Sequence, residues 1–134
     1  MSKSYGNIID PFLPEKKLRK VIMKIVSDST PVEDAKVASA DTTFQIFSAI
    51  AGAESERTLD LRKKYEAQGI GFGYGHAKQM LFELIFEEFG EARKRREELA
   101  EDPAYVSKIL HDGAEAANDQ LTLVAQRTRR AAGL

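Results

Sequence analysis

Residues 76–101, HAKQMLFELIFEEFGEARKRREELAE, decide the fold class of this chain. Their apolar residues recur at steps of three and four, the spacing that lines up side chains on one face of an α-helix. The core-facing set consists of Leu81, Leu84, Ile85, Phe89 and Ala92. Charged side chains fill most positions between them. The stretch therefore predicts one long amphipathic helix over 76–101.

Downstream, Asp102 and Pro103 predict the start of another helix, because aspartate is a good N-cap and proline suits the first helical turn. Apolar and small residues then recur with helical spacing as Val106, Leu110, Ala114, Ala117, Leu121, Val124 and Thr128. Basic residues near the end suit the negative pole of the helix dipole. We expect a second long helix that ends near Gly133.

Upstream, residues 15–27 predict an amphipathic helix with a basic outer face, with Leu18 and Ile22 on its apolar side. The turn Asp28-Ser29-Thr30-Pro31 ends it, since the residue before a proline disfavours the helical conformation. Residues 28–41 lack periodicity and are expected to form an extended connector.

Two further helices are expected over residues 42–52, with Thr42 or Thr43 as the cap, and over residues 54–68. The buried candidates of the second of these are Leu59, Leu61 and Tyr65.

Four glycines follow in strict alternation, at positions 69, 71, 73 and 75. This spacing differs from the G-x-G-x-x-G dinucleotide fingerprint, and no strand pattern precedes it. We expect Gly69 to give the preceding helix a left-handed end, with Ile70, Phe72 and Tyr74 turned inward. No strand pattern of any length occurs, so the predicted fold is all-α, a bundle of about five helices preceded by a flexible loop.

Composition narrows the function. The 134 residues include 43% hydrophobic and 31% charged residues and no cysteine, as expected for a single folded domain without disulfides or thiolate metal sites. The two histidines, His76 and His111, are isolated, so no metal site is expected. No apolar run approaches a membrane span and no signal-type segment opens the chain, which predicts a cytoplasmic protein without a membrane partner.

The first 30 residues carry six lysines and arginines against three carboxylates. Such a basic segment suits a polyphosphate or a nucleic acid, although a solvated helix face explains it nearly as well. The opening residues MSKSYGN place Lys3 between two serines, a combination able to hold a polyphosphate through an ammonium group and hydroxyls. A polar start of an ordinary chain is the alternative. No nucleophile elbow, Walker loop or H-E-x-x-H motif is present.

The opening MSKSYGN resembles the K-M-S-K-S loop of class I aminoacyl-tRNA synthetases without its first lysine. The stretches LRKVIMKIVSDSTP, KYEAQGIGFGYGHAKQMLFELI, DPAYVSKILHDGAEAAN and VAQRTRRAAGL are similar, in order, to bacterial tryptophanyl-tRNA synthetases from that loop to the C-terminus. The resemblance covers essentially the whole chain.

This resemblance implies a catalytic loop and connector at residues 1–14 and a helical tRNA- and anticodon-binding domain at 15–134. Met1, Ser2, Lys3 and Ser4 correspond to the loop that closes over ATP, with Lys3 as the catalytic residue that stabilises charge on the departing pyrophosphate. ATP with Mg²⁺ serves the full-length enzyme, and nothing is expected to be bound to this chain by itself. Candidate contacts to tRNA(Trp) are Lys78, Arg93, Arg96, Arg127 and Arg130, while a solvated helix face with pairing along the helix is the alternative for each arginine cluster.

The sequence also departs from the family. No H-x-G-H signature and no parallel β/α region occur. We therefore expect the nucleotide-binding catalytic domain to be missing, the isolated chain to form no tryptophanyl-adenylate, and the full-length ligase to be a homodimer that binds tRNA rather than DNA. A second hypothesis is a helical protein-interaction module without an RNA role, whose exposed apolar patch would include Ile8, Ile9, Phe12 and Leu13.

Overall fold

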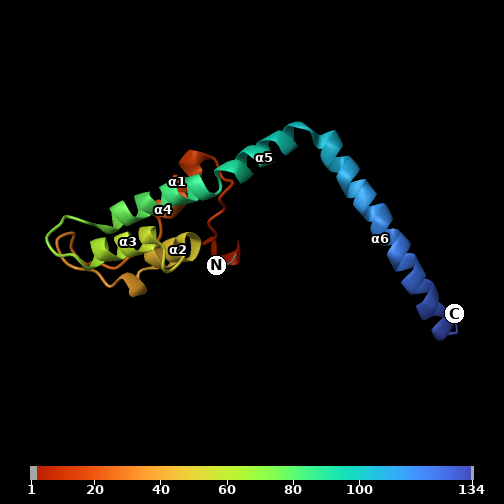
Figure 1. Cartoon of the computed structure of the whole chain (residues 1–134), viewed down its shortest axis with the longest axis horizontal. Coiled ribbons are helices and arrows are strands. Elements are labelled where there is room, and N and C mark those ends of the chain that lie inside the picture. The colour runs from red at the N-terminus through yellow and green to blue at the C-terminus, as the bar shows by residue number, and fades with distance from the viewer. Residues whose placement is uncertain (1–2, 134) are drawn as a thin grey trace. The chain divides into compact units, whose positions relative to one another are not determined.

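The computed structural model describes residues 3–133, and these form helices and connecting segments without a strand. A 3₁₀ turn, η1 (Lys3–Tyr5), is followed by α1 (Glu15–Met23), a second 3₁₀ turn, η2 (Ala38–Ala40), α2 (Thr42–Ala51), α3 (Glu56–Glu66), α4 (Tyr74–Glu88), α5 (Gly90–Glu101) and α6 (Pro103–Ala131) (Figure 1). The predicted all-α class is confirmed.

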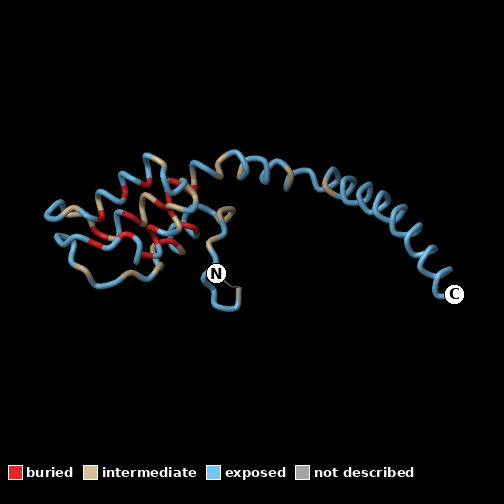
Figure 2. Tube along the Cα trace, turned by 60° about the horizontal axis from the view of Figure 1, so that its bottom comes forward, coloured by how far each residue is buried: buried red, intermediate tan, exposed pale blue. Residues whose placement is uncertain are grey.

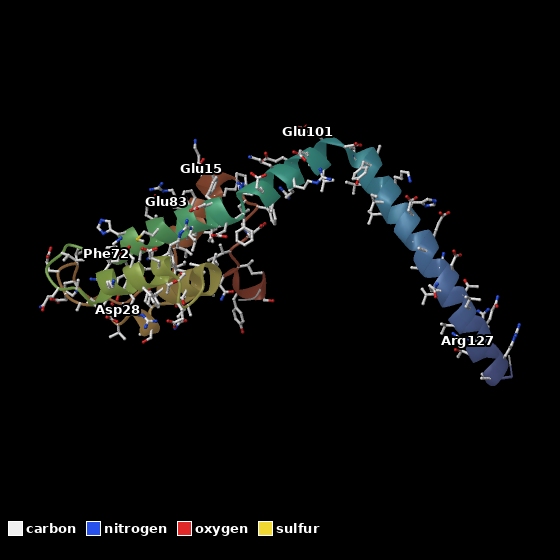
Figure 3. The ribbon with its side chains drawn as sticks, in the orientation of Figure 1. Glu15, Asp28, Phe72, Glu83, Glu101 and Arg127 are labelled. Carbon is white, nitrogen blue, oxygen red and sulfur yellow. The ribbon has the colours of Figure 1, made fainter. Side chains whose placement is uncertain are left out.

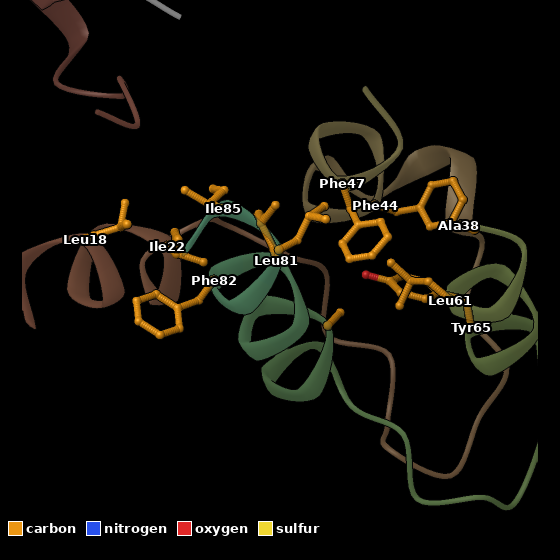
Figure 4. Close-up of a cluster of buried hydrophobic side chains, with 12 residues drawn as sticks. Leu18, Ile22, Ala38, Phe44, Phe47, Leu61, Tyr65, Leu81, Phe82 and Ile85 are labelled. Atoms are coloured by element: carbon orange, nitrogen blue, oxygen red, sulfur yellow. The ribbon is translucent and has the colours of Figure 1, made fainter. Parts of the chain in front are cut away.

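The chain divides into two compact units, residues 1–93 and 94–134. In the first unit, α4 packs against both α1 and α2, and α2 packs against α3. Their apolar faces meet in one core (Figure 4) that contains Leu18, Ile22, Ala38, Phe44, Phe47, Leu61, Tyr65, Ala77, Leu81, Phe82, Leu84 and Ile85. The 3.6-residue periodicity thus identified most of the buried residues of α1 and α4.

The helix predicted over 76–101 is two helices. The first, α4, ends at Glu88, and α5 begins at Gly90. A backbone hydrogen bond from the Phe89 N–H to the Ile85 carbonyl at 3.1 Å closes α4, and one from the Arg93 N–H to the Phe89 carbonyl at 2.9 Å begins α5. Phe89 has φ −98° and ψ 7° beside a glycine of low helix propensity, so the regular helix is interrupted here. This break raises the number of α-helices in the described residues from the expected five to six.

Asp41, rather than Thr42 or Thr43, caps α2. Its side chain accepts a hydrogen bond from the Phe44 N–H at 3.0 Å and a second from the Tyr65 hydroxyl at 2.7 Å. The prediction of a threonine cap was wrong because an aspartate one residue earlier meets the same need and also satisfies a buried tyrosine.

Two burial predictions fail in the segment around α3. Leu59 is 39% exposed, whereas Leu61 and Tyr65 are fully buried. Ile70 is 54% exposed, while Phe72 and Tyr74 pack partly against the core. Gly69 and Gly71 have φ of 72° and 68°, the left-handed conformation that glycine adopts without strain. The backbone reverses at these positions and turns the Ile70 side chain outward.

In the second unit, α6 runs over 29 residues, and Asp102 caps it by accepting a hydrogen bond from the Tyr105 N–H at 2.9 Å. Both the predicted helix and its cap are confirmed. The apolar stripe predicted along it, however, is not part of a core, since α6 has no buried residue among those described (Figure 2).

Candidate functional site: the opening loop and the basic helix surfaces

The opening loop begins with η1, and Gly6 then turns the chain with φ 62°. Ser4 and Tyr5 are exposed to solvent. The loop candidates Met1 and Ser2 lie outside the described residues, and of Lys3 only the backbone is described. The residue types of this segment, a lysine and a serine beside a glycine turn, fit the oxygen-rich surface of a polyphosphate.

A pocket of about 440 Å³ lies next to this loop. Its walls come from the loop, the end of α1 and the start of α2, namely Gly6, Asn7, Ile9, Val21, Lys24, Ile25, Val26, Thr42 and Ile46. Most of these side chains are apolar, and Val26 is 85% exposed. The structure thereby brings Lys24 close to the opening loop, a proximity that the sequence did not predict.

Asp28 organises the turn that follows α1 (Figure 3). Its Oδ1 accepts hydrogen bonds from the Thr30 N–H at 2.8 Å and from the Tyr74 hydroxyl at 2.7 Å, which joins the connector to the start of α4. Hydrogen bonds from Thr30 and then from Tyr74 lower the pKa of Asp28. Burial and the bond to Asp28 raise the pKa of Tyr74 to about 12. The sequence marked this turn only as a helix stop.

Lys36 is a buried lysine that the sequence did not single out. Its Nζ donates to the backbone carbonyls of Pro31 at 2.9 Å and Asp34 at 2.8 Å, and it lies 5.6 Å from the centre of the Tyr74 ring. The Lys36 ammonium therefore holds two parts of the connector together through their backbone carbonyls. This position is structural, because its hydrogen-bonding capacity is directed at the chain's own backbone.

The predicted tRNA contacts fall in different surroundings. Lys78 is half-buried on α4. Arg93 donates from one nitrogen to the Pro11 carbonyl and from another to the Leu13 carbonyl at 3.0 Å, and its guanidinium lies 4.5 Å from the centre of the Phe86 ring. Arg93 thus holds the segment before α1 against the start of α5.

The other three candidates belong to the second unit. Arg96 is exposed on α5. Arg127 (Figure 3) and Arg130 are exposed near the end of α6, and their spacing of three residues puts them on one side of the helix. Lys78 and Arg93 belong to the first unit. The candidates therefore form no single cluster within either unit.

A further basic surface lies on α1. The side chains of Lys16, Lys17, Lys20 and Lys24 are exposed, on the side of the helix opposite the buried Leu18 and Ile22. The neighbouring Arg19 lies over the Phe82 ring at 5.7 Å. The sequence indicated this basic outer face, and no contact was assigned to it.

Within residues 3–133, no group of three or more histidine, cysteine, aspartate or glutamate side chains is placed to hold a metal ion. In the same part of the chain, no helix is both long enough and apolar enough to cross a bilayer.

Comparison with known proteins identifies relatives over the whole chain. It is 43% identical to the tryptophan–tRNA ligase of Rhodopirellula baltica over 134 residues, which is 100% of the chain and 41% of that protein. It is 38% identical to the tryptophan–tRNA ligase of Fusobacterium nucleatum over 133 residues, 98% of the chain and 38% of that protein. No protein-family profile matches it.

Comparison with solved structures identifies the same class of relatives. A crystal structure of tryptophanyl-tRNA synthetase from Campylobacter jejuni superimposes with a TM-score of 0.89 at 39% identity, over 100% of this chain and 42% of that one. A second crystal structure of that enzyme, in complex with ADP and tryptophan, superimposes with a TM-score of 0.88.

The chain is thus homologous to the helical C-terminal part of an aminoacyl-tRNA synthetase. Within that class its relatives are the tryptophan–tRNA ligases, and it spans about two fifths of the length of the ones it matches.

Proposed function

We propose that this chain provides two working parts of a tryptophan–tRNA ligase, an ATP-contacting loop within residues 1–14 and a tRNA-binding helical domain within 15–134. The similarity to such ligases over all 134 residues carries this proposal. The neighbouring crystal structure with ADP and tryptophan adds support, because that enzyme binds a nucleotide.

The loop would act on the triphosphate of ATP, which arrives with Mg²⁺. Tryptophan's carboxylate attacks the α-phosphorus, and pyrophosphate leaves with the bonding electrons. The Lys3 ammonium would face the negative charge that grows on the leaving group, and Met1, Ser2 and Ser4 would shape the loop around it. The glycine turn at Gly6 supports this role, since it lets the backbone come close to a bulky anion.

The helical part would hold the anticodon arm of tRNA(Trp). Unpaired anticodon bases are read by stacking and hydrogen bonds, while lysine and arginine hold the phosphates. Exposed Arg96, Arg127 and Arg130 suit phosphate contacts, and half-buried Lys78 suits a shorter-range contact. Arg93 is also a candidate, and an RNA contact there would have to compete with its bonds to the Pro11 and Leu13 carbonyls.

The partners of this role are tRNA(Trp), a nucleotide-binding catalytic domain and a second subunit of the full-length enzyme, all in the cytoplasm. A test starts with the chain alone. We expect no tryptophan-dependent exchange of pyrophosphate into ATP, together with tighter binding of tRNA(Trp) than of a tRNA with another anticodon. Exchange by the isolated chain, or equal binding of both tRNAs, would contradict the proposal.

A second candidate function is a protein-interaction module, and the exposed apolar residues of α6 favour it. Ile109, Leu110, Leu121 and Val124 are 50–69% exposed. In the first unit, Ile8 is exposed, and Ile9, Phe12 and Leu13 are half-buried. Static light scattering tests this function. A chain that stays monomeric at all concentrations and binds no other protein would argue against it.

A further inference from the structure

The lysine row of α1, defined as Lys16, Lys17, Lys20 and Lys24, is arranged along one helix surface. Lys16, Lys20 and Lys24 follow at steps of four residues, which are about 6 Å apart along the helix axis. Lys17 lies beside them. Their side opposes the face that packs on α4, so the charges point away from the core.

This arrangement costs stability. Like charges four residues apart repel each other, and cations in a first helical turn face the positive end of the helix dipole. Lys16 and Lys17 occupy that first turn. The helix dipole favours a lysine near the C-terminal end, where Lys20 occupies the last turn and Lys24 is the C-cap, so the dipole cost falls on Lys16 and Lys17.

Two lysines elsewhere pair with a carboxylate on their own helix, whereas within residues 3–133 Lys63 and Lys78 also form no ion pair. On α3, Lys64 pairs with Asp60 at 2.7 Å, and on α6, Lys108 pairs with Asp112 at 2.6 Å, both four residues apart. Within residues 3–133, the four ammonium groups of the lysine row form no ion pair and no hydrogen bond. Four lysines without a carboxylate partner repel one another, and such an arrangement is expected where an external anion neutralises their charge.

One end of the lysine row lies near the opening loop. Its last member, Lys24, borders the pocket that Gly6 and Asn7 of the opening loop line. A polyanion that follows the lysine row would therefore be led toward the loop. Long, flexible lysine side chains at about 6 Å steps reach successive phosphates of one strand without demanding a fixed geometry.

We propose that the lysine row of α1 binds the phosphate backbone of tRNA, outside the anticodon arm. This inference rests on the proposed function for its choice of RNA. An acidic protein surface is the competing occupant, and the experiment below separates the two.

The experiment is a binding titration of the full 134-residue chain with tRNA(Trp) over a salt series. The test variant is Lys16→Gln/Lys17→Gln/Lys20→Gln. The matched control is Lys63→Gln/Lys64→Gln/Lys108→Gln, which removes the same charge from exposed or half-exposed helix positions elsewhere. Each phosphate contact contributes roughly 0.7–0.9 to the slope of log affinity against log salt.

We expect the test variant to lower that slope by about 2 and to weaken binding about tenfold or more at low salt, while the control keeps the slope. The test variant should also melt at the same or a higher temperature than the unmodified chain, since repulsion is relieved. A role of the row in folding alone would give a lower melting temperature and an unchanged slope.

Three results would overturn the inference. They are an unchanged slope in the test variant, equal loss in both variants, and no RNA binding by the unmodified chain. In the last case, binding of polyglutamate that the test variant loses would assign the row to an acidic protein surface. The proposed function fails separately, when the unmodified chain binds tRNA(Trp) no better than another tRNA while the row still sets the slope.

Discussion

At the scale of the residue, single polar side chains fix the segments that carry no helix. Lys36 ties the connector through three backbone carbonyls, and Asp28 ties it to the first turn of α4 through Tyr74. Neither role could be predicted from the sequence, because each depends on residues brought together by the turn at Pro31 or across 46 positions. Only the local Asp28-to-Thr30 turn has a short-range signal, an aspartate two residues before a threonine.

Asp41 gives a residue-scale prediction. Asp41→Ala removes the cap of α2 and leaves the buried Tyr65 hydroxyl without its partner. A lost cap costs about 1 kcal/mol and an unsatisfied buried group about 1–3 kcal/mol, so we expect a loss of about 2–4 kcal/mol in urea unfolding. Thr42→Ala is the control for the cap expected from sequence, and it should change stability by less than about 0.5 kcal/mol.

Asp28 gives a pH-dependent prediction. Its pKa is lowered in the folded chain from an ordinary value of 3.8, so its stabilising effect is present above that pH and is lost as the pH falls through the lower, folded value. The melting temperatures of the unmodified chain and of Asp28→Asn should therefore differ at pH 6, and the difference should shrink as the pH falls below 3.8 toward the lowered folded pKa. Asp34→Asn removes the same charge nearby as a control. A difference that stays constant with pH would contradict the assignment.

At the scale of the element, helix spacing predicted α1, α2, α3 and α6 within a few residues, and the start but not the end of α4, since local periodicity defines these helices. The bend at Phe89 was not predicted, because a single glycine within a helical pattern lowers helix propensity without necessarily ending the helix. The solvent exposure of the apolar side chains of α6 was not predicted either, because periodicity predicts an apolar face but not whether another element covers that face. For the candidate site, the sequence supplied residue types and could not show that Arg93 holds backbone carbonyls 80 and 82 positions away.

Arg93 gives an element-scale prediction. Arg93→Ala removes two charged hydrogen bonds and a cation–π contact that hold the segment before α1 to α5. We expect a loss of roughly 1.5–3 kcal/mol and faster hydrogen exchange at residues 10–18. Arg95→Ala, which removes an exposed pair with Glu98, should cost no more than about 0.5 kcal/mol. Equal effects of the two changes would show that the Arg93 contacts do not anchor the segment.

Gly90 tests the bend itself. A Cβ at Gly90 meets nothing within 4 Å, and its φ lies outside the left-handed region. Gly90→Ala should therefore stabilise the chain by about 0.5–1 kcal/mol, measured by urea unfolding, through higher helix propensity. A loss of stability would mean that the bend needs glycine.

At the scale of the whole molecule, a chain that spans about two fifths of its relatives contains the opening loop residues and an all-helical part, and its sequence has no H-x-G-H signature. The all-α fold and the similarity to tryptophan–tRNA ligases could be predicted from the sequence, because the resemblance runs along the entire chain. The proposed contacts to ATP and tRNA could not be placed from the sequence, since residue types alone do not show which side chains meet a ligand.

The central claim is that the opening segment is a working catalytic loop once a nucleotide-binding domain is present. It is tested most directly by joining this chain at Met1 to the remaining N-terminal part of the Rhodopirellula baltica ligase and measuring tryptophan-dependent pyrophosphate exchange. We predict exchange by the hybrid and a fall in kcat of about 10²-fold or more in its Lys3→Ala variant, as for the loss of one transition-state charge contact. A folded hybrid without exchange, or a Lys3→Ala variant as fast as its parent, would contradict the claim.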